Sequence, residues 1–451
     1  MNYSQCLQSL INLGHELNRA KFDLESIRII TRALGNPQSE YPTAIVAGTN
    51  GKGSTSAMLA SILVATGYRT GLYTSPHLIR VNERIRIDGH EITDTDFADA
   101  FTEIWRTVDG LLENKELAHR PSFFEFLTAT AFLHFARARI DFAVLEVGMG
   151  GRLDATNITE PRVAVITNID LDHQQFLGNT VAAIAWEKAG IIRPGRPVIS
   201  ACENPEAEEV IRKRAAELNA PLNELAHAAQ VSSIRNLDGR FAFDLTLDGE
   251  NFPGLASPLM GSFQIKNTVA AVAAAKRLAH EGFKISRAAI AEGIRTTVWP
   301  GRMEVICNHP LVVLDGAHNP AAAREIAAAA RTLWPERALR LVYASMRDKS
   351  IDEISGILFP LAIEVYLTQP EQERAAAPEE ILSLTNHRGP KIVIEPNPVR
   401  ALERACRESS ADDVVLVAGS LFLVGAIKRA LAERQLDPES LAGHAVGSPL
   451  P

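Results

Sequence analysis

The stretch Ala47-Gly48-Thr49-Asn50-Gly51-Lys52-Gly53-Ser54-Thr55-Ser56 lies between a segment of strand pattern and a segment of helix pattern. The apolar run 43–46 predicts a buried strand, and the apolar spacing over 54–66 predicts a helix that Gly67 stops. Between them, three glycines let main-chain N–H groups approach an anion closely, and the helix N-terminus adds roughly half a positive charge. Lys52 would neutralise phosphate oxygens, and the hydroxyl of Ser54 or Thr55 would reach a bridging Mg²⁺. The stretch therefore predicts a site for nucleotide phosphates.

The spelling of this loop departs from the general P-loop pattern G-x-x-x-x-G-K-[ST]. Val46 stands where the first glycine of the pattern belongs, and Gly53 separates Lys52 from Ser54. A glycine-rich turn with a solvated lysine is the structural alternative. The strand before the loop, the helix after it and the cluster of hydroxyl groups favour the nucleotide interpretation.

Length and composition limit the kinds of protein that fit. At about 150 residues per domain, 451 residues predict two or three domains, and 46% hydrophobic residues supply their cores. A net charge of −8 argues against a general binder of nucleic acid or acidic membranes. The four cysteines form no C-x-x-C pair, so neither a zinc site nor a disulfide framework is expected. With no signal-peptide core and no run long enough to cross a bilayer, we expect a cytoplasmic protein with no membrane partner.

The order of expected strands and helices predicts an α/β protein of two domains. Residues 1–298 form a P-loop domain with a mainly parallel sheet, in which 81–92 is expected as a hairpin around Asp88-Gly89. Trp299-Pro300-Gly301-Arg302 marks the expected hinge. Strands and helices alternate again over 299–451, which predicts a second, smaller domain built on a parallel sheet.

Polar side chains follow several expected strands, at the edge where open α/β sheets bind ligands. Glu146 ends an otherwise apolar strand, where a lone acid is costly unless paired, so it is a candidate for Mg²⁺ or its bound water. Taken alone, Ser75 is typical of a serine in a turn before proline, and His173 is typical of a histidine in a loop. Next to Glu146 and the phosphate loop, a shared site is the favoured interpretation.

The helix expected over 122–138 begins with Ser122, Phe123, Phe124 and Glu125. Two rings and an acid at a helix N-terminus form a surface able to stack on a flat heterocycle and accept its hydrogen bonds. Aromatic residues of such a helix usually belong to the core. The residues themselves leave both interpretations open.

Together these motifs resemble the folylpolyglutamate synthase and dihydrofolate synthase branch of the Mur ligase superfamily. The resemblance begins at the loop, where a glycine follows the lysine, and covers nearly the whole chain. The other motifs are Ser75-Pro76-His77, Glu146-Val147-Gly148, Leu171-Asp172-His173, Glu187-Lys188-Ala189-Gly190, Pro300-Gly301-Arg302 and Asp315-Gly316-Ala317-His318-Asn319-Pro320. The resemblance implies a Mur-ligase-like N-terminal domain and a Rossmann-like C-terminal domain.

The resemblance also implies the roles of single residues. The ATP site would comprise Thr49, Asn50, Gly51, Lys52, Gly53, Ser54, Asn267, Arg302 and Asp315. The Mg²⁺ ligands would be Ser54, Ser75, Glu146 and His173. The catalytic residues would be Lys52, Asp315, His318 and Lys188, which resembles the family's carbamylated lysine. The contacts on the pterin side would be Ser122, Phe123, Phe124, Glu125, Leu153 and Asp154.

The implied activity is ATP-dependent ligation of L-glutamate to a folate-type carboxylate, which is tetrahydrofolate, dihydropteroate or both. Because a carboxylate is a poor electrophile, ATP would phosphorylate it, and the glutamate amine would attack the acyl phosphate. Two domains joined at a hinge would close over this intermediate and exclude water. We expect a monomer that binds these small molecules and no nucleic acid. The alternatives are a nucleotide-regulated binding protein and a peptidoglycan-precursor ligase of the same superfamily, which Gly53 and the segment 122–125 disfavour.

Overall fold

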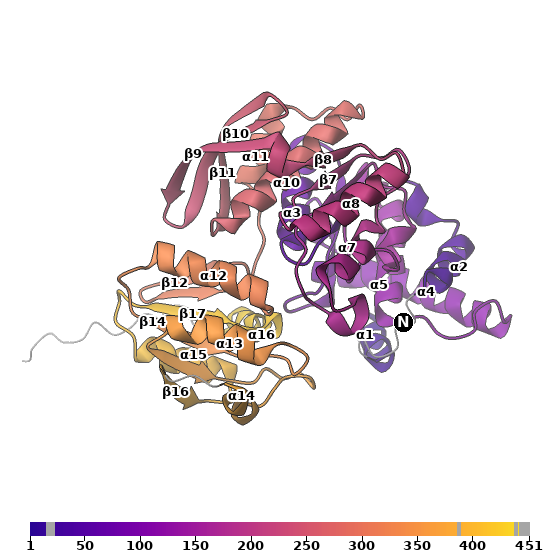
Figure 1. Cartoon of the computed structure of the whole chain (residues 1–451). Helices are drawn as coiled ribbons and strands as arrows, with labels where there is room; N and C mark the ends of the chain where they lie inside the picture. The colour runs from indigo at the N-terminus through magenta and orange to yellow at the C-terminus, as the bar shows by residue number, and fades with distance from the viewer. Residues whose placement is uncertain (15–22, 386–388, 437–440, 442–451) are drawn as a thin grey trace, which may run out of the picture. The chain divides into compact units, whose positions relative to one another are not determined.

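The computed structural model describes residues 1–14, 23–385, 389–436 and 441. They form two compact units, which are shown in Figure 1. The first unit comprises Met1–Arg235, Ala242–Pro258 and Gln264–Thr297. The second comprises Asn236–Phe241, Leu259–Phe263 and the chain from Val298 onward. The second unit thus takes in two short segments that precede the expected hinge.

The first unit is built on an eight-stranded sheet with the strand order β4-β3-β2-β5-β1-β6-β7-β8. The six neighbouring strands β2, β5, β1, β6, β7 and β8 run parallel, as predicted for a mainly parallel sheet. Every residue of β1, β2, β5, β6 and β7 is buried, because helices cover a parallel sheet on its faces. Their bounds are β1 (Thr43–Ala47), β2 (Thr70–Tyr73), β5 (Phe142–Glu146), β6 (Val163–Ile166), β7 (Val198–Ser200) and β8 (Leu222–Glu224).

The predicted hairpin lies at one edge of this sheet and is shorter than expected. Its strands are β3 (Ile85–Ile87) and β4 (His90–Glu91), which pair antiparallel. Residues Val81–Arg84, expected to be extended, form a 3-10 helix instead. The reason is the carboxylate of Glu83, which accepts the N–H groups of Leu78, Ile79 and Arg80 and draws this segment into a turn.

The helices expected over 54–66 and 122–138 are both present in the first unit. The helix after the phosphate loop, α3 (Lys52–Ala65), packs tightly on α11 (Arg287–Arg295), where a Cβ on Gly293 would lie 2.3 Å from the Cα of Ile62. The other helices are α1 (Tyr3–Asn12), α2 (Glu25–Ala33), α4 (Asp94–Glu113), α5 (Phe123–Arg137), α6 (Gln174–Leu177), α7 (Val181–Ala189), α8 (Pro205–Glu217), α9 (Leu225–Ala228) and α10 (Phe263–His280). A separate three-stranded sheet contains β9 (Ala229–Leu237), β10 (Arg240–Leu247) and β11 (Glu250–Met260).

The second unit is built on a six-stranded sheet with the order β12-β13-β17-β14-β15-β16. Five of its strands are parallel and were predicted: β13 (Leu311–Leu314), β14 (Leu339–Tyr343), β15 (Glu364–Leu367), β16 (Lys391–Ile394) and β17 (Val414–Ala418). The prediction missed β12 (Glu304–Asn308), an antiparallel edge strand. A two-residue turn at His309-Pro310 allows this pairing.

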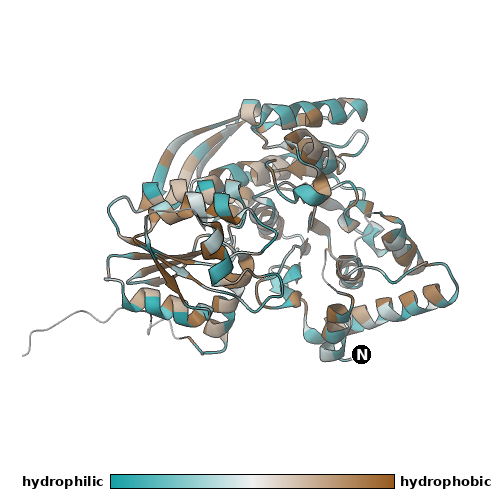
Figure 2. Ribbon diagram, turned by 60° about the horizontal axis from the view of Figure 1, so that its bottom comes forward, coloured by the Kyte–Doolittle hydropathy of each residue, from teal (hydrophilic) through white to brown (hydrophobic). Residues whose placement is uncertain are grey.

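Helices of the second unit alternate with its parallel strands. They are α12 (Pro320–Leu333), α13 (Ile351–Leu358), α14 (Pro378–Leu384), α15 (Pro398–Arg407) and α16 (Leu421–Ala432). In Figure 2 the strands of this sheet are brown, whereas the helices carry teal residues on part of their surface. In the part of the chain that the structure describes, no helix combines the length and the apolar character needed to cross a membrane.

Candidate functional site: a phosphate loop beside two lysines

Close approach of the backbone to other groups explains two glycines of the loop between β1 and α3. A Cβ on Gly48 would lie 1.9 Å from the hydroxyl oxygen of Thr167. Gly51, the N-cap of α3, has φ 81°, and a Cβ there would lie 2.3 Å from Oδ1 of Asn267. A side chain at either position would displace these neighbours, so the loop keeps its shape only with glycine. Asn267, predicted to belong to the nucleotide site, therefore lies directly against the loop.

The loop is fixed by the segment that follows β6. The N–H groups of Thr49 and Asn50 donate to the main-chain and side-chain oxygens of Asn168, at 2.7 and 2.6 Å. The hydroxyl of Thr167 donates to the carbonyl of Asn50 at 2.6 Å, and the hydroxyl of Thr49 donates to the carbonyl of Asp170 at 3.1 Å. The sequence motif in this segment is Leu171-Asp172-His173, and Thr167, Asn168 and Asp170 were not predicted to belong to the site. Their role is to hold the loop.

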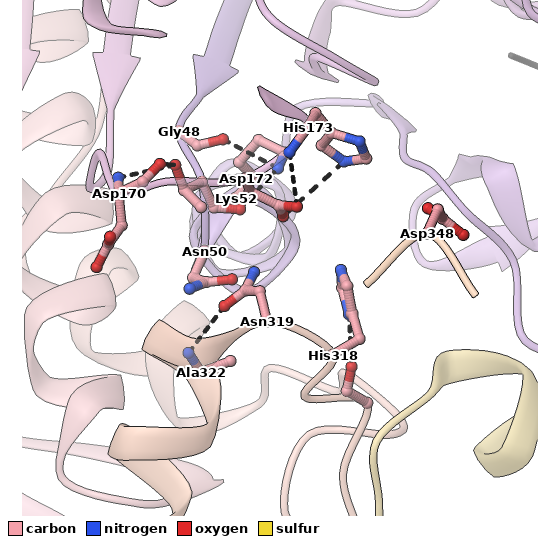
Figure 3. Close-up of polar contacts among 12 residues, drawn as sticks. Gly48, Asn50, Lys52, Asp170, Asp172, His173, His318, Asn319, Ala322 and Asp348 are labelled. Carbon is pink, nitrogen blue, oxygen red and sulfur yellow. Dashed lines mark hydrogen bonds and ion pairs between the residues drawn. The ribbon is translucent and has the colours of Figure 1, made fainter. Parts of the chain in front are cut away.

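Two lysines converge on the loop. Nζ of Lys52 donates to the carbonyl oxygens of Gly48 and Thr49, at 3.0 and 3.1 Å (Figure 3). Nζ of Lys188, which is 4% exposed, donates to the same oxygen of Gly48 at 2.7 Å. Burial and the nearby charge of Lys52 lower the pKa of Lys188 to about 7, against the opposing effect of Asp172 and Asp154. The fold therefore favours the uncharged amine of Lys188 more than water does.

Two of the predicted metal ligands, Ser75 and Glu146, are hydrogen-bonded to each other. Oε2 of Glu146, a buried carboxylate at the end of β5, accepts the N–H of Ser75 at 3.1 Å. His173 lies at the start of α6 with φ 50°, and its N–H donates to Oδ1 of Asp172 at 2.8 Å (Figure 3). Among the described residues, no three or more His, Cys, Asp or Glu side chains are grouped as metal ligands. Asp172, which was not predicted as a site residue, acts on Lys188 instead, because its negative charge opposes the lowering of the Lys188 pKa.

The first turn of α5 has structural partners for its polar side chains. Ser122 and Glu125 form a capping box: the Ser122 hydroxyl accepts the N–H of Glu125, and Oε2 of Glu125 accepts the N–H of Ser122 at 2.8 Å. The guanidinium of Arg84 lies 5.3 Å from the ring centroid of Phe123. Helix capping therefore explains Ser122 and Glu125 without a ligand, whereas Phe123 and Phe124 remain half-buried.

Asp154 organises the loop after β5. Its buried carboxylate accepts the N–H groups of Gly148, Met149 and Thr156, each at 3.0 Å, and the hydroxyl of Thr156 at 2.6 Å. Burial raises the pKa of Asp154, and these hydrogen bonds oppose the increase. Leu153 is half-buried and packs against the apolar cluster that includes α4 and α5. Both residues thus hold this loop in place.

In the second unit, Asp315 and His318 lie on the turn between β13 and α12. The carboxylate of Asp315 is buried and accepts the N–H groups of Met303 and Ala317, at 2.9 and 2.7 Å. Burial raises the pKa of Asp315, and the charge of Arg302 opposes this shift. Nδ1 of His318 lies 2.8 Å from the carbonyl oxygen of Gly316. Asn319 caps α12 by accepting the N–H of Ala322 at 2.9 Å (Figure 3). Arg302, which precedes β12, approaches the same turn, because a Cβ on Gly316 would lie 2.4 Å from its Nη1.

Comparisons with known proteins identify the family of the chain. Family models described as the Mur ligase middle domain and the Mur ligase, glutamate ligase domain match residues 46–275 and 301–421. The dihydrofolate synthase/folylpolyglutamate synthase of Bacillus subtilis (strain 168) is 33% identical over 400 residues, which are 88% of this chain and 92% of that protein.

Two solved structures are similar over almost the whole chain. Escherichia coli FolC in complex with DHPP and ADP has a TM-score of 0.85 and 31% identity, covering 97% of this chain and 100% of that one. Mycobacterium tuberculosis folylpolyglutamate synthase complexed with ADP has a TM-score of 0.87 and 32% identity, covering 94% and 98%. The chain therefore belongs to the folylpolyglutamate synthase/dihydrofolate synthase branch of the Mur ligases and is an ATP-dependent ligase.

Proposed function

We propose that this ligase joins L-glutamate to a folate-type carboxylate, with ATP as the phosphate donor. The convergence of Lys52 and Lys188 on the carbonyl of Gly48, at the N-terminus of α3, is the observation that carries the proposal. Cationic groups beside a helix N-terminus suit the phosphates of a nucleotide. The names of the relatives and the ADP in the solved structures support the same activity.

The reaction proceeds in two steps. A carboxylate oxygen of the folate-type substrate attacks the γ-phosphorus of ATP, the bond to the bridging oxygen breaks, and ADP leaves. The glutamate amine then attacks the acyl-phosphate carbon, inorganic phosphate leaves, and the amine gives up a proton. Lys52 and the N–H groups of the loop would stabilise the charge on the transferred phosphoryl group.

Magnesium is part of the proposal. The carboxylate of Glu146 and the hydroxyls of Ser75 and Ser54 are the hard oxygen donors that Mg²⁺ prefers. The main-chain N–H of Ser75 donates to Glu146, which holds these two residues next to each other. His173 is the predicted fourth ligand. Bound there, Mg²⁺ would neutralise phosphate charge.

Lys188 is proposed to be carbamylated. Its uncharged amine, favoured by a pKa of about 7, is the form that attacks CO₂, forming an N–C bond and releasing a proton. The product is a buried carboxylate-like anion. It would replace the like-charge repulsion between Lys188 and Lys52 with attraction.

Two groups of predicted site residues rest on the resemblance. Arg302, Asp315 and His318 are proposed to act on the same nucleotide. On the pterin side, Phe123 and Phe124 are the best candidates for stacking, because they are half-buried while Ser122, Glu125 and Asp154 have internal hydrogen-bond partners. Leu153 would add an apolar contact.

The decisive experiment measures ADP release with Mg²⁺, ATP and glutamate, given dihydropteroate and tetrahydrofolate in separate reactions. The proposal expects release only when glutamate and a folate-type carboxylate are both present, with a glutamyl amide as product. Release that ignores both substrates would instead support the nucleotide-regulated binding protein, which the relatives do not favour. ADP release with a peptidoglycan precursor in place of the folate-type substrate would instead support a peptidoglycan-precursor ligase.

Sedimentation of the purified chain tests the predicted monomer, and cell fractionation tests the predicted cytoplasmic location.

A further inference from the structure

The turn after β5 is packed directly on the last turn of α7. A Cβ on Gly151 would lie 2.8 Å from the carbonyl oxygen of Glu187, and a Cβ on Gly190 would lie 2.3 Å from the Cβ of Arg152. The N–H of Arg152 donates to the carbonyl of Glu187 at 2.7 Å, and their side chains form an ion pair at 2.8 Å. The turn and the helix end are therefore in contact with no room for added atoms.

One buried amide bridges these two segments. Asn157 is 3% exposed and lies in the 3-10 helix Ala155–Ile158 that follows the turn. Its Nδ2 donates to the carbonyl of Arg152 at 3.1 Å and to the carbonyl of Gly190 at 3.0 Å. Its Oδ1 accepts from Nη2 of Arg193 at 2.9 Å. Each N–H and the oxygen of the amide thus has a partner, and the two donor bonds join the turn to the helix end.

Both joined segments carry predicted site residues. Lys188 lies in the last turn of α7, two positions before Gly190, and reaches the phosphate loop through the carbonyl of Gly48. Asp154 ends the turn and holds the N–H groups of Gly148 and Met149. A shift of one segment against the other would move Lys188 relative to Asp154.

We propose that Asn157 is a positioning residue of the ligase reaction, which holds the turn 151–154 on the end of α7 and so fixes Lys188 relative to Asp154. This inference rests on the proposed function for its kinetic part only. The donor side of the amide does the positioning. The acceptor side binds Arg193, which also donates to the carbonyl groups of Asn157 and Thr159, at 2.5 and 3.2 Å, and so anchors the 3-10 helix independently.

Two variants distinguish the role of the donor side of the Asn157 amide from that of its acceptor side. Asn157→Ala removes the whole amide, and Asn157→Asp keeps the shape and the acceptor for Arg193 but loses both donor bonds. Asn223→Ala is the matched control, because Asn223 is 5% exposed, lies on β8 at the sheet edge and donates to Asp248 at 3.0 Å. It removes a buried amide from the same unit without touching the turn or α7.

The kinetic readout compares kcat, the KM for the folate-type substrate and the KM for ATP. For Asn157→Asp and Asn157→Ala, kcat/KM for the folate-type substrate should fall about 10- to 100-fold, as for other residues that orient ligands, while KM for ATP changes less than about twofold. Asn223→Ala should keep its kcat/KM within about twofold even where it melts at a lower temperature. Wild-type kinetics in Asn157→Asp, or an equal loss in Asn223→Ala, overturns the proposal.

A second readout does not depend on activity. Amide hydrogen exchange of peptides covering 148–156 and 186–192 should speed up in both Asn157 variants and not in Asn223→Ala. Unchanged exchange in Asn157→Asp overturns the inference even if the kinetics change. If the wild-type chain releases no ADP with folate and glutamate, the proposed function fails, and the exchange result still decides whether Asn157 holds the turn on α7.

Discussion

Lys52 and Lys188 donate to the same main-chain oxygen, the carbonyl of Gly48, at 3.0 and 2.7 Å. The two ammonium groups share this carbonyl oxygen, and the charged form is the less stable one for Lys188, the more deeply buried of the two. Its pKa falls to about 7, first through burial and then through the charge of Lys52. An anion at the N-terminus of α3 would relieve this repulsion, which links the electrostatics of the loop to nucleotide binding.

Lys52→Ala should lower kcat at least about 100-fold, because it removes a cation placed against the phosphates. The melting temperature should change little, since the side chain contacts loop carbonyls and not the core. Lys266→Ala, which removes a half-exposed lysine paired with Glu203, is the control in the same ADP-release assay. A near-wild-type kcat of Lys52→Ala would contradict the assignment of this loop as a site for nucleotide phosphates.

Lys188→Ala should be nearly inactive and should regain part of its activity with added short carboxylic acids. The acid would occupy the space left by the side chain and restore the oxygen that a carbamate supplies. Lys188→Arg should not be rescued, because it keeps a fixed cation and has no amine to carbamylate. Full activity of Lys188→Ala, or equal rescue of both variants, would contradict the carbamate and leave Lys188 as an ordinary lysine at a helix end.

The free energy of unfolding should depend on pH through Lys188. Its pKa is about 7 in the folded protein against 10.5 for an ordinary lysine, so between these values the unfolded chain binds a proton that the folded chain lacks. Stability of the wild type should therefore rise with pH across this window, relative to Lys188→Met. Urea unfolding of both proteins without bicarbonate, from about pH 6 to about pH 9, should show the advantage of Lys188→Met shrinking. A constant difference contradicts the lowered pKa.

His318→Ala should lower turnover about 10- to 100-fold although it lies in the second unit, if His318 positions groups of the nucleotide. The control is His309→Ala, which alters an exposed histidine of the same unit. Steady-state kinetics with varied ATP separate a change in kcat from one in KM. Two variants with identical, wild-type kinetics would leave this turn with a structural role alone.

Ser122→Ala should lower the free energy of unfolding by about 1 kcal/mol, because the hydroxyl caps α5. Chemical denaturation measures this loss, and Thr93→Ala at the start of α4 gives the matched cap removal. If Ser122 also contacts the pterin, only Ser122→Ala raises KM for the folate-type substrate. An unchanged KM would remove Ser122 from the substrate site.

The sequence alone predicted most of the fold. The strands β1, β5 and β6 are short apolar runs, and such a run is a local feature that predicts burial on both faces. The loop before α3 is contiguous, so its chemistry could be predicted directly. Val81–Arg84 was predicted wrongly because the carboxylate of Glu83 competes with the strand ladder. The residues Ser122 to Glu125 left a ligand surface and a core role open, and neither interpretation recognised S-x-x-E as the signature of a capping box.

Long-range contacts of the site were decided only by the tertiary structure. Lys188 meets Gly48 across 140 positions, and Asn168 holds Asn50 across 118, so no periodicity or spacing connects these partners. Asn157 stands in a turn that by its sequence is ordinary, and its importance follows from the two carbonyl groups that the fold brings to its amide. Local sequence thus determined most of the elements that form and which loop is the candidate for binding phosphate. The charge state of Lys188 and the joining of the turn 151–154 to α7 depend on burial and close approach, which exist only once the chain has packed.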